Sequence, residues 1–177
     1  MFAIVAQESG GHTREDRMFK RLLLTGFVVF ALMFGVTPAS AGPPQDAAGE
    51  WKYLPTLVDF KQAGPNLFLY GTDVGTWTGT FDGESTEDFV VVCHPKAGFS
   101  FYKGTIEFTG TVDGQEGTLT IKTNGKQESD TCDPSPAIWH GRWVIIGGTG
   151  DLADLHGNGT FTGPSLDLDY EGQIHFS

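Results

Sequence analysis

The feature that most restricts the fold of this chain is a strict alternation of apolar and polar residues. In residues 166–176 every even position holds an apolar residue or Gly, and every odd position before the end holds a charged or polar residue. Successive side chains of a β-strand point to opposite faces, so this pattern predicts a strand with one buried and one wet face. Residues 118–122 and 76–81 alternate in the same way.

Further strands and their turns fill most of the remaining chain. The dipeptides Asp82-Gly83, Asp113-Gly114 and Asn124-Gly125 are typical of the tight turns that join strands, and the clearest hairpin joins residues 105–112 to 115–122. Helical periodicity is almost absent. The other predicted strands are residues 51–57, 67–72, 89–93, 99–103 running on towards 112, 138–146 and 159–162. About eight short strands with turns every 8 to 12 residues favour an antiparallel barrel or sandwich.

Glycines within the strands favour the barrel. They mark bulges or tight bends in strands, and here they are Gly79, Gly104, Gly110, Gly141 and Gly172. We therefore predict an all-β fold, a single antiparallel barrel of about eight strands over residues 51–177. The interior of such a barrel is either filled by side chains or holds one small ligand.

The first 41 residues differ from the rest. Residues 18–21 are a short basic opening, residues 22–36 are mostly apolar, and residues 39–41 are small, as signal peptidases require. This predicts a signal peptide over residues 1–41 rather than a membrane anchor, because a spanning helix needs about 20 apolar residues. The segment before Met18 is acidic, so we hypothesise that translation starts at Met18. Residues 42–50 are expected to be a disordered lead-in.

The charge of the chain excludes two classes of partner. The protein has 177 residues, with 11 Lys and Arg against 22 Asp and Glu; without residues 1–41 it keeps 7 basic and 19 acidic residues. Such an acidic chain repels phosphate backbones and anionic lipid headgroups. We expect no nucleic-acid partner, no membrane association after signal cleavage, and a secreted or periplasmic location.

The two cysteines, Cys93 and Cys132, are expected to pair. Export delivers them to an oxidising compartment, where a pair of cysteines normally forms a disulfide. The alternative is a reactive thiol, for which His94 beside Cys93 is the only supporting feature.

A family resemblance appears in two segments. The stretch from Trp143 to Phe161, with its Gly-Thr-Gly-Asp-Leu and Leu-His-Gly-Asn-Gly, resembles a signature of a bacterial family of uncharacterised proteins, and residues 108–119 resemble a hairpin of the same family. That family is related to the allene oxide cyclase-like and dirigent-like barrels. The resemblance implies an antiparallel eight-stranded barrel and no established activity.

The chain also departs from that family. The cysteine pair, the Pro-rich loop at residues 133–136 and the signal peptide are not features of its usual cytosolic members. None of the active-site residues of plant allene oxide cyclase can be carried over, because they lie outside the matched motifs. The resemblance therefore implies a fold but indicates no particular reaction.

No motif for metal or cofactor chemistry stands out. The five histidines show no metal-like pairing, and the chain lacks a nucleophile elbow and a phosphate-binding loop. Asp151, Asp154 and His156 could hold a cation, but the resemblance implies a structural crossover there. We expect no metal and no cofactor.

The candidate site residues are one acid and six aromatics. Glu107 is either a solvated surface acid, if Ile106 and Phe108 face inward, or a buried acid–base catalyst, if a bulge reverses the strand. The expected interior aromatics, which either form the core or line an apolar ligand pocket, are Trp77, Phe81, Tyr102, Phe108, Trp143 and Tyr170. Residues 138–146 are apolar on both faces and could join copies of the chain in a homo-oligomer.

Two functional hypotheses follow. The favoured one is a non-catalytic secreted barrel that binds a small hydrophobic molecule or assembles with itself, and it predicts a lumen without paired ionisable groups. The alternative is a cyclase-like or isomerase-like enzyme, which predicts a deep pocket with a perturbed carboxyl group.

Overall fold

The computed structural model describes residues 42–128, residue 132 and residues 137–177, and eight strands account for most of them. Their bounds are β1 Gln45–Ala63, β2 Asn66–Gly79, β3 Phe81–His94, β4 Phe99–Val112, β5 Gln115–Gln127, β6 Ile138–Gly150, β7 Leu155–Pro164 and β8 Asp167–Phe176. The predicted signal peptide, with Met18, and the Pro-rich loop at 133–136 lie outside the described residues.

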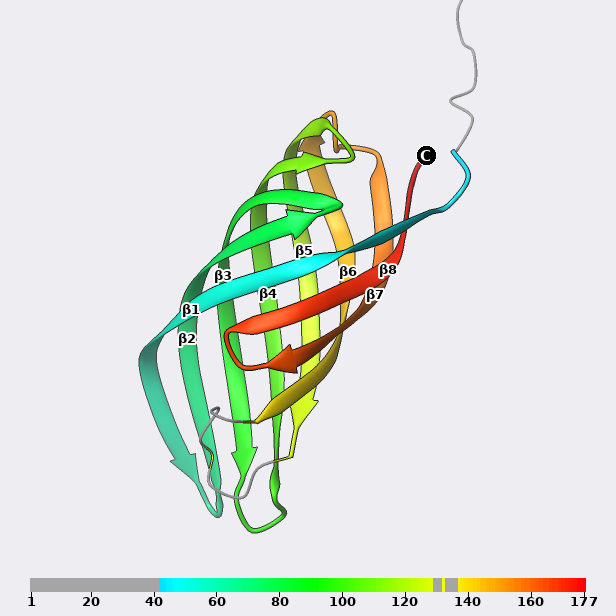
Figure 1. Ribbon diagram of the computed structural model, residues 1–177. Coiled ribbons are helices and arrows are strands. Elements are labelled where there is room, and N and C mark those ends of the chain that lie inside the picture. Colours follow the sequence, from blue (N-terminus) through cyan, green and yellow to red (C-terminus); the bar gives the residue numbers. More distant parts are fainter. Residues whose placement is uncertain (1–41, 129–131, 133–136) are drawn as a thin grey trace, which may run out of the picture. The chain divides into compact units, whose positions relative to one another are not determined.

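The strands form a closed antiparallel barrel in which each strand pairs with its neighbours in sequence and β8 pairs with β1 (Figure 1). The closing pair runs from Gln45 opposite Ile174 to Lys52 opposite Asp167. Closure removes most exposed sheet edges. The prediction of a single all-β barrel is confirmed. The described residues contain no helix long and apolar enough to cross a bilayer.

The predicted lead-in is the main error in the placement of elements. Residues 45–50 are not disordered: they begin β1 and pair with β8, and the side chain of Ala47 is buried. Small residues such as Ala47, which lies opposite Gly172, let the two strands close the barrel, but they carry no strong strand signal. The barrel therefore begins before residue 51.

Two of the three predicted turns are also wrong. Asp113-Gly114 forms the turn between β4 and β5, with φ angles of 51° and 79° that suit a tight hairpin. Asp82-Gly83 instead lies inside β3 and Asn124-Gly125 inside β5. The turn near residue 82 is at Gly79, where φ is 105°. The segments 67–72 and 76–79 are consequently one strand.

The barrel has two different ends. The connections β1–β2, β3–β4, β5–β6 and β7–β8 lie at one end, which we call the disulfide end, because Cys93 of β3 is bonded there to Cys132, with a Cα–Cα separation of 5.5 Å. Strand β1 starts and β8 finishes at the other end, which we call the closed end. The predicted disulfide is present.

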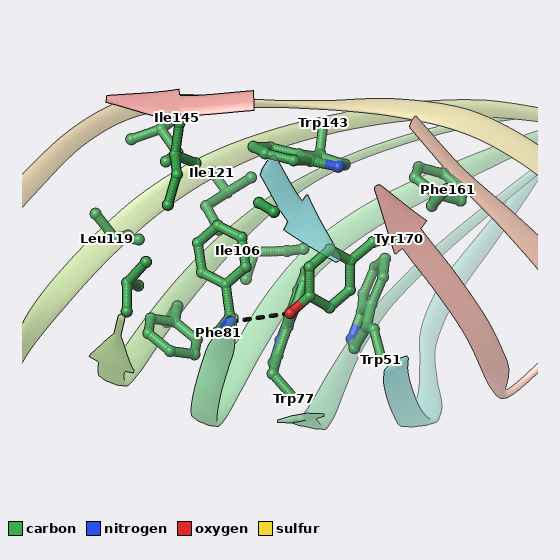
Figure 2. Close-up of a cluster of buried hydrophobic side chains, with 14 of the residues drawn as sticks. Trp51, Trp77, Phe81, Ile106, Leu119, Ile121, Trp143, Ile145, Phe161 and Tyr170 are labelled. Carbon is green, nitrogen blue, oxygen red and sulfur yellow. Dashed lines mark hydrogen bonds between the residues drawn. The ribbon is translucent and has the colours of Figure 1, made fainter. Parts of the chain in front are cut away.

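The closed end is filled by a packed aromatic core (Figure 2). Trp77, Phe81 and Tyr170 contact one another with ring centroids 5.2 to 5.7 Å apart, and the backbone N–H of Phe81 donates a 2.9 Å hydrogen bond to the Tyr170 hydroxyl. Aliphatic side chains complete the layer; they include Ile106, Leu119, Ile121, Ile145 and Ile174. These buried side chains pack against one another and form the core of this half.

Candidate functional site

The disulfide half of the barrel interior is hollow. It encloses a cavity of about 330 Å³ whose surface is almost entirely apolar. The walls come from strands around the barrel and include six aromatic side chains: Trp51, Tyr53, Phe89, Tyr102, Trp139 and Phe161. Several of these rings contact one another, including Tyr102 with Trp139 at 5.7 Å and Trp51 with Phe161 at 5.9 Å between centroids.

The cavity has a floor and a mouth. Trp51, Asp73 and Glu87 are the lining residues of β1, β2 and β3 that lie farthest along each strand from the disulfide end, so they form the floor. Leu57 and Leu166 also line the cavity, yet 57% and 46% of their surfaces are exposed, so the cavity opens beside them. Cys132 lies on the cavity wall, which places the disulfide at this mouth.

Two carboxyl groups meet at the floor, so the expectation that the lumen would lack paired ionisable groups is wrong. Asp73 of β2 and Glu87 of β3 are cross-strand partners, and each is almost fully buried. The two carboxyl groups are close enough to influence each other, and their interaction lowers the pKa of Asp73 and raises that of Glu87. Two buried carboxylates on adjacent strands repel each other, so the pair favours keeping one proton.

Polar neighbours hold the Glu87 carboxyl in place. The hydroxyl of Tyr102 donates to its Oε1, and the Thr123 hydroxyl lies 2.8 Å from the same oxygen and 2.9 Å from the Tyr102 hydroxyl. Gly104 provides the room, because a Cβ at that position would overlap Glu87 Oε1. The Glu87 carboxyl group can therefore take this position only because residue 104 of β4 is a glycine.

The two acids differ in pKa. Burial and the Asp73 charge raise the pKa of Glu87 to about 9, and burial raises the pKa of Asp73 to about 6. Burial also raises the pKa of Tyr102 well above its ordinary value. Near neutral pH the floor therefore holds one protonated acid, Glu87, beside one carboxylate, Asp73.

The described residues provide no positive charge in the interior to balance that carboxylate. None of the basic side chains in the described ranges lines the cavity, and no ion pair among the described residues involves Asp73 or Glu87. Two further buried polar atoms on the wall have no hydrogen-bond partner in the described part of the chain: Gln127 Oε1 and Trp51 Nε1. The site thus offers mainly acceptors that lack a donor.

The predicted interior aromatics all lie inside the barrel, but only Tyr102 borders the cavity. The other five belong to the core beyond the cavity floor: Trp77, Phe81, Phe108, Trp143 and Tyr170. Of the two roles weighed for them, the structure gives these five the packing role.

Glu107 lies on the outside of the barrel. Its carboxylate accepts a 3.0 Å hydrogen bond from the exposed Thr120 hydroxyl, whereas Ile106 and Phe108 on either side are fully buried. The pairing of β4 with β3 and β5 runs without a bulge, so the phase of the strand is not reversed. The buried acid–base role for Glu107 is therefore wrong.

The acids at the floor were missed, although the sequence contains a signal for them. Asp73 is four residues before Trp77, and Glu87 is six residues after Phe81, so each shares the parity of a predicted interior aromatic. Extending the alternation along unbroken strands places both carboxyl groups inside. The two wrongly placed breaks, one between residues 72 and 76 and the other at Asp82-Gly83, concealed this.

Asp151, Asp154 and His156, the cluster considered as a cation site, do not form a three-ligand metal site. Within residues 42–128, 132 and 137–177, no group of three or more His, Cys, Asp or Glu side chains is placed to hold an ion. Asp151 and Asp154 lie in the short connection between β6 and β7, whose Leu152 is buried under the barrel.

Comparison with known proteins identifies the family. The fold is similar to the crystal structure of a protein with unknown function from the DUF3224 family of Shewanella oneidensis MR-1, with a TM-score of 0.59 and 15% identity over 76% of this chain and 98% of that one. No curated protein matches the sequence. Residues 72–171, more than half of the chain, match the family described as "Protein of unknown function (DUF3224)", and the chain therefore belongs to that family.

Proposed function

We propose that this protein is a binding protein for a small, mostly apolar molecule, which it holds in the cavity at the disulfide end. The observation that carries the proposal is the cavity itself, about 330 Å³ of apolar and aromatic lining with two buried carboxyl groups at its floor. Small-molecule sites typically combine such walls with a few polar anchors. A protein interior without a ligand role is normally packed to exclude voids of this size.

A neutral fluorescent probe tests the proposal. N-phenyl-1-naphthylamine, which is uncharged at neutral pH, is expected to bind with one saturable site per barrel. Val91→Trp fills the cavity and should abolish binding, whereas Val90→Trp, on the adjacent residue outside the cavity lining, should preserve it. Thermal unfolding verifies that both variants fold. Absence of saturable binding, or equal binding by both variants, contradicts the proposal.

A second candidate function is proton-transfer catalysis on a molecule in the same cavity. It is favoured by one observation, the pair of adjacent carboxyl groups whose pKa values are held apart, which is the usual arrangement of an acid with a base. This is the cyclase-like or isomerase-like alternative, with Asp73 as base and Glu87 as acid in place of Glu107. A likeness to allene oxide cyclase-like barrels would favour this second candidate, and the closed barrel of eight sequentially paired strands supports that likeness.

The base-promoted ring opening of 5-nitrobenzisoxazole tests this second candidate. Asp73 would remove the ring C–H proton, the electron pair of that bond would form the nitrile as the N–O bond breaks, and Glu87 would donate a hydrogen bond to the phenolate oxygen that develops. Asp73→Asn should abolish any rate above that of the buffer, and Asp88→Asn, an exposed acid on β3, should not. Equal rates in both variants exclude catalysis by the floor.

The proposed location is outside the cytoplasm. The disulfide and the signal-like first 41 residues support it. Sequencing the N-terminus of protein recovered from the periplasm or medium should give Gly42 as the first residue. Recovery only from the cytoplasm, with the N-terminus intact, contradicts export.

Self-assembly through β6 is the remaining part of the proposal. Ile138, Val144 and Ile146 expose apolar side chains along the outer face of this strand. Sedimentation should show an oligomer that Val144→Lys dissociates. A monomer at high concentration excludes this interface.

A further inference from the structure

The charges at the proposed ligand site indicate which charge the ligand carries. Asp73 and Glu87 are 4% and 2% exposed and lie opposite each other on β2 and β3, and one retained proton leaves the pair with one negative charge. Buried charges in proteins are normally paired with an opposite charge, because an isolated one is costly to desolvate. No cation of the described chain supplies that pairing.

Among the described residues of the wall, the unpaired polar atoms are mainly acceptors, and the indole N–H of Trp51 is an unpaired donor beside them. Asp73 Oδ1 has no hydrogen-bond partner among the described residues, and neither has Gln127 Oε1, on a side chain only 2% exposed. Both atoms belong to side chains that line the cavity. A ligand that satisfies these acceptors must donate hydrogen bonds, and the buried acid pair repels a carboxylate or phosphate ligand.

The aromatic wall suits a positive charge. Trp51 and Tyr102 lie beside the acids in the lining, with Tyr53, Phe161 and Trp139 adjoining them. The faces of such rings attract ammonium groups, and the attraction is strongest where water is excluded. The acidic balance of the whole chain, −11, also raises the concentration of cations near the protein.

Resting on the proposed function, we propose that the ligand is a lipophilic amine bound as its ammonium ion, with its nitrogen at the Asp73 carboxylate and its apolar body against the aromatic wall. The ammonium replaces the missing internal cation and donates to the unpaired acceptor. Its hydrocarbon part occupies the rest of the cavity, towards Leu69 and Val91.

Three probes of similar size and different charge test this inference by displacement of N-phenyl-1-naphthylamine. At about pH 7.5, 2-phenylethylamine is expected to bind about tenfold or more tightly than 2-phenylethanol, and 3-phenylpropanoate is expected not to bind. Asp73→Asn should reduce the affinity for the amine to that for the alcohol. The exposed acid Asp88 gives the matched control, and Asp88→Asn should leave the preference unchanged.

The outcomes separate this inference from the function on which it rests. Binding of the neutral fluorescent probe by each variant shows that the cavity is folded and open. If that probe binds but the amine and the alcohol have equal affinity, or Asp73→Asn keeps the preference, the amine inference is wrong and the binding function stands. If neither the neutral probe nor the amine binds, both are wrong.

Discussion

Asp73 and Glu87 lie directly opposite each other on β2 and β3, with both carboxyl groups turned into the barrel. Cross-strand acids at such positions normally repel, and side chains that face a barrel interior are normally apolar. Burial of this pair raises both pKa values, so the fold retains a proton that an unfolded chain would release. The acid pair therefore opposes stability, which is expected of a site kept for function.

The acid pair predicts an unusual dependence of stability on pH. The pKa of Glu87 is about 9 in the folded protein, which is above its value in the unfolded chain. Between these two pKa values the folded protein binds more protons than the unfolded chain, so the free energy of unfolding falls as pH rises. One such group contributes a slope of up to about 1.4 kcal/mol per pH unit. Glu87→Gln should remove the slope between about pH 7 and 9.

Urea unfolding at a series of pH values measures this slope. The exposed Glu84 on the same strand gives the control, and Glu84→Gln should unfold with the slope of the original protein. A flat profile in the original protein would show that Glu87 is ionised at neutral pH.

Gly104 is predicted to be indispensable for the floor. Gly104→Ala places a methyl group against Glu87 Oε1 and 2.8 Å from Thr123 Oγ1, and should lower the free energy of unfolding by about 2 kcal/mol. Gly147→Ala is the control, since no atom lies within 4 Å of its added Cβ, and its effect should stay within about 1 kcal/mol. Equal effects of the two variants on chemical denaturation would mean that the Glu87 carboxyl lies elsewhere.

The closed end is predicted to depend on the Tyr170 hydroxyl. Tyr170→Phe leaves the buried Phe81 N–H without an acceptor and should cost about 1 to 3 kcal/mol in thermal or urea unfolding. Tyr70→Phe, at an exposed position, should cost far less. Because the hydroxyl is remote from the cavity lining, probe binding by the folded Tyr170→Phe variant should be unchanged.

The disulfide is predicted to stabilise the fold and the mouth. Its two cysteines are 39 residues apart, so replacing both by Ser should cost about 4 kcal/mol by the chain-entropy argument. Cys132 also lines the cavity, so the double variant should release the neutral probe faster. Alkylation of two thiols in the native, unreduced protein would contradict the pairing.

The sequence was most informative where alternation runs unbroken. Most of β8 could be predicted, since Leu168, Tyr170 and Ile174 are buried as their parity requires. Leu166, by contrast, lies in the turn before the strand with 46% of its surface exposed. Ala47 could not, because small residues give no strand signal before the partner strand is known. The cavity could not be predicted either, since whether a barrel interior is filled depends on how side chains from all strands divide its volume.

Intermolecular NOEs between the neutral probe N-phenyl-1-naphthylamine and methyl-labelled protein test the central claim most directly. The account predicts contacts to the methyl groups of Leu69, Val91 and Leu168, which line the cavity. Contacts confined to outward-facing methyl groups such as those of Val144, or no contacts at all at saturating probe, would show that the cavity is not a binding site.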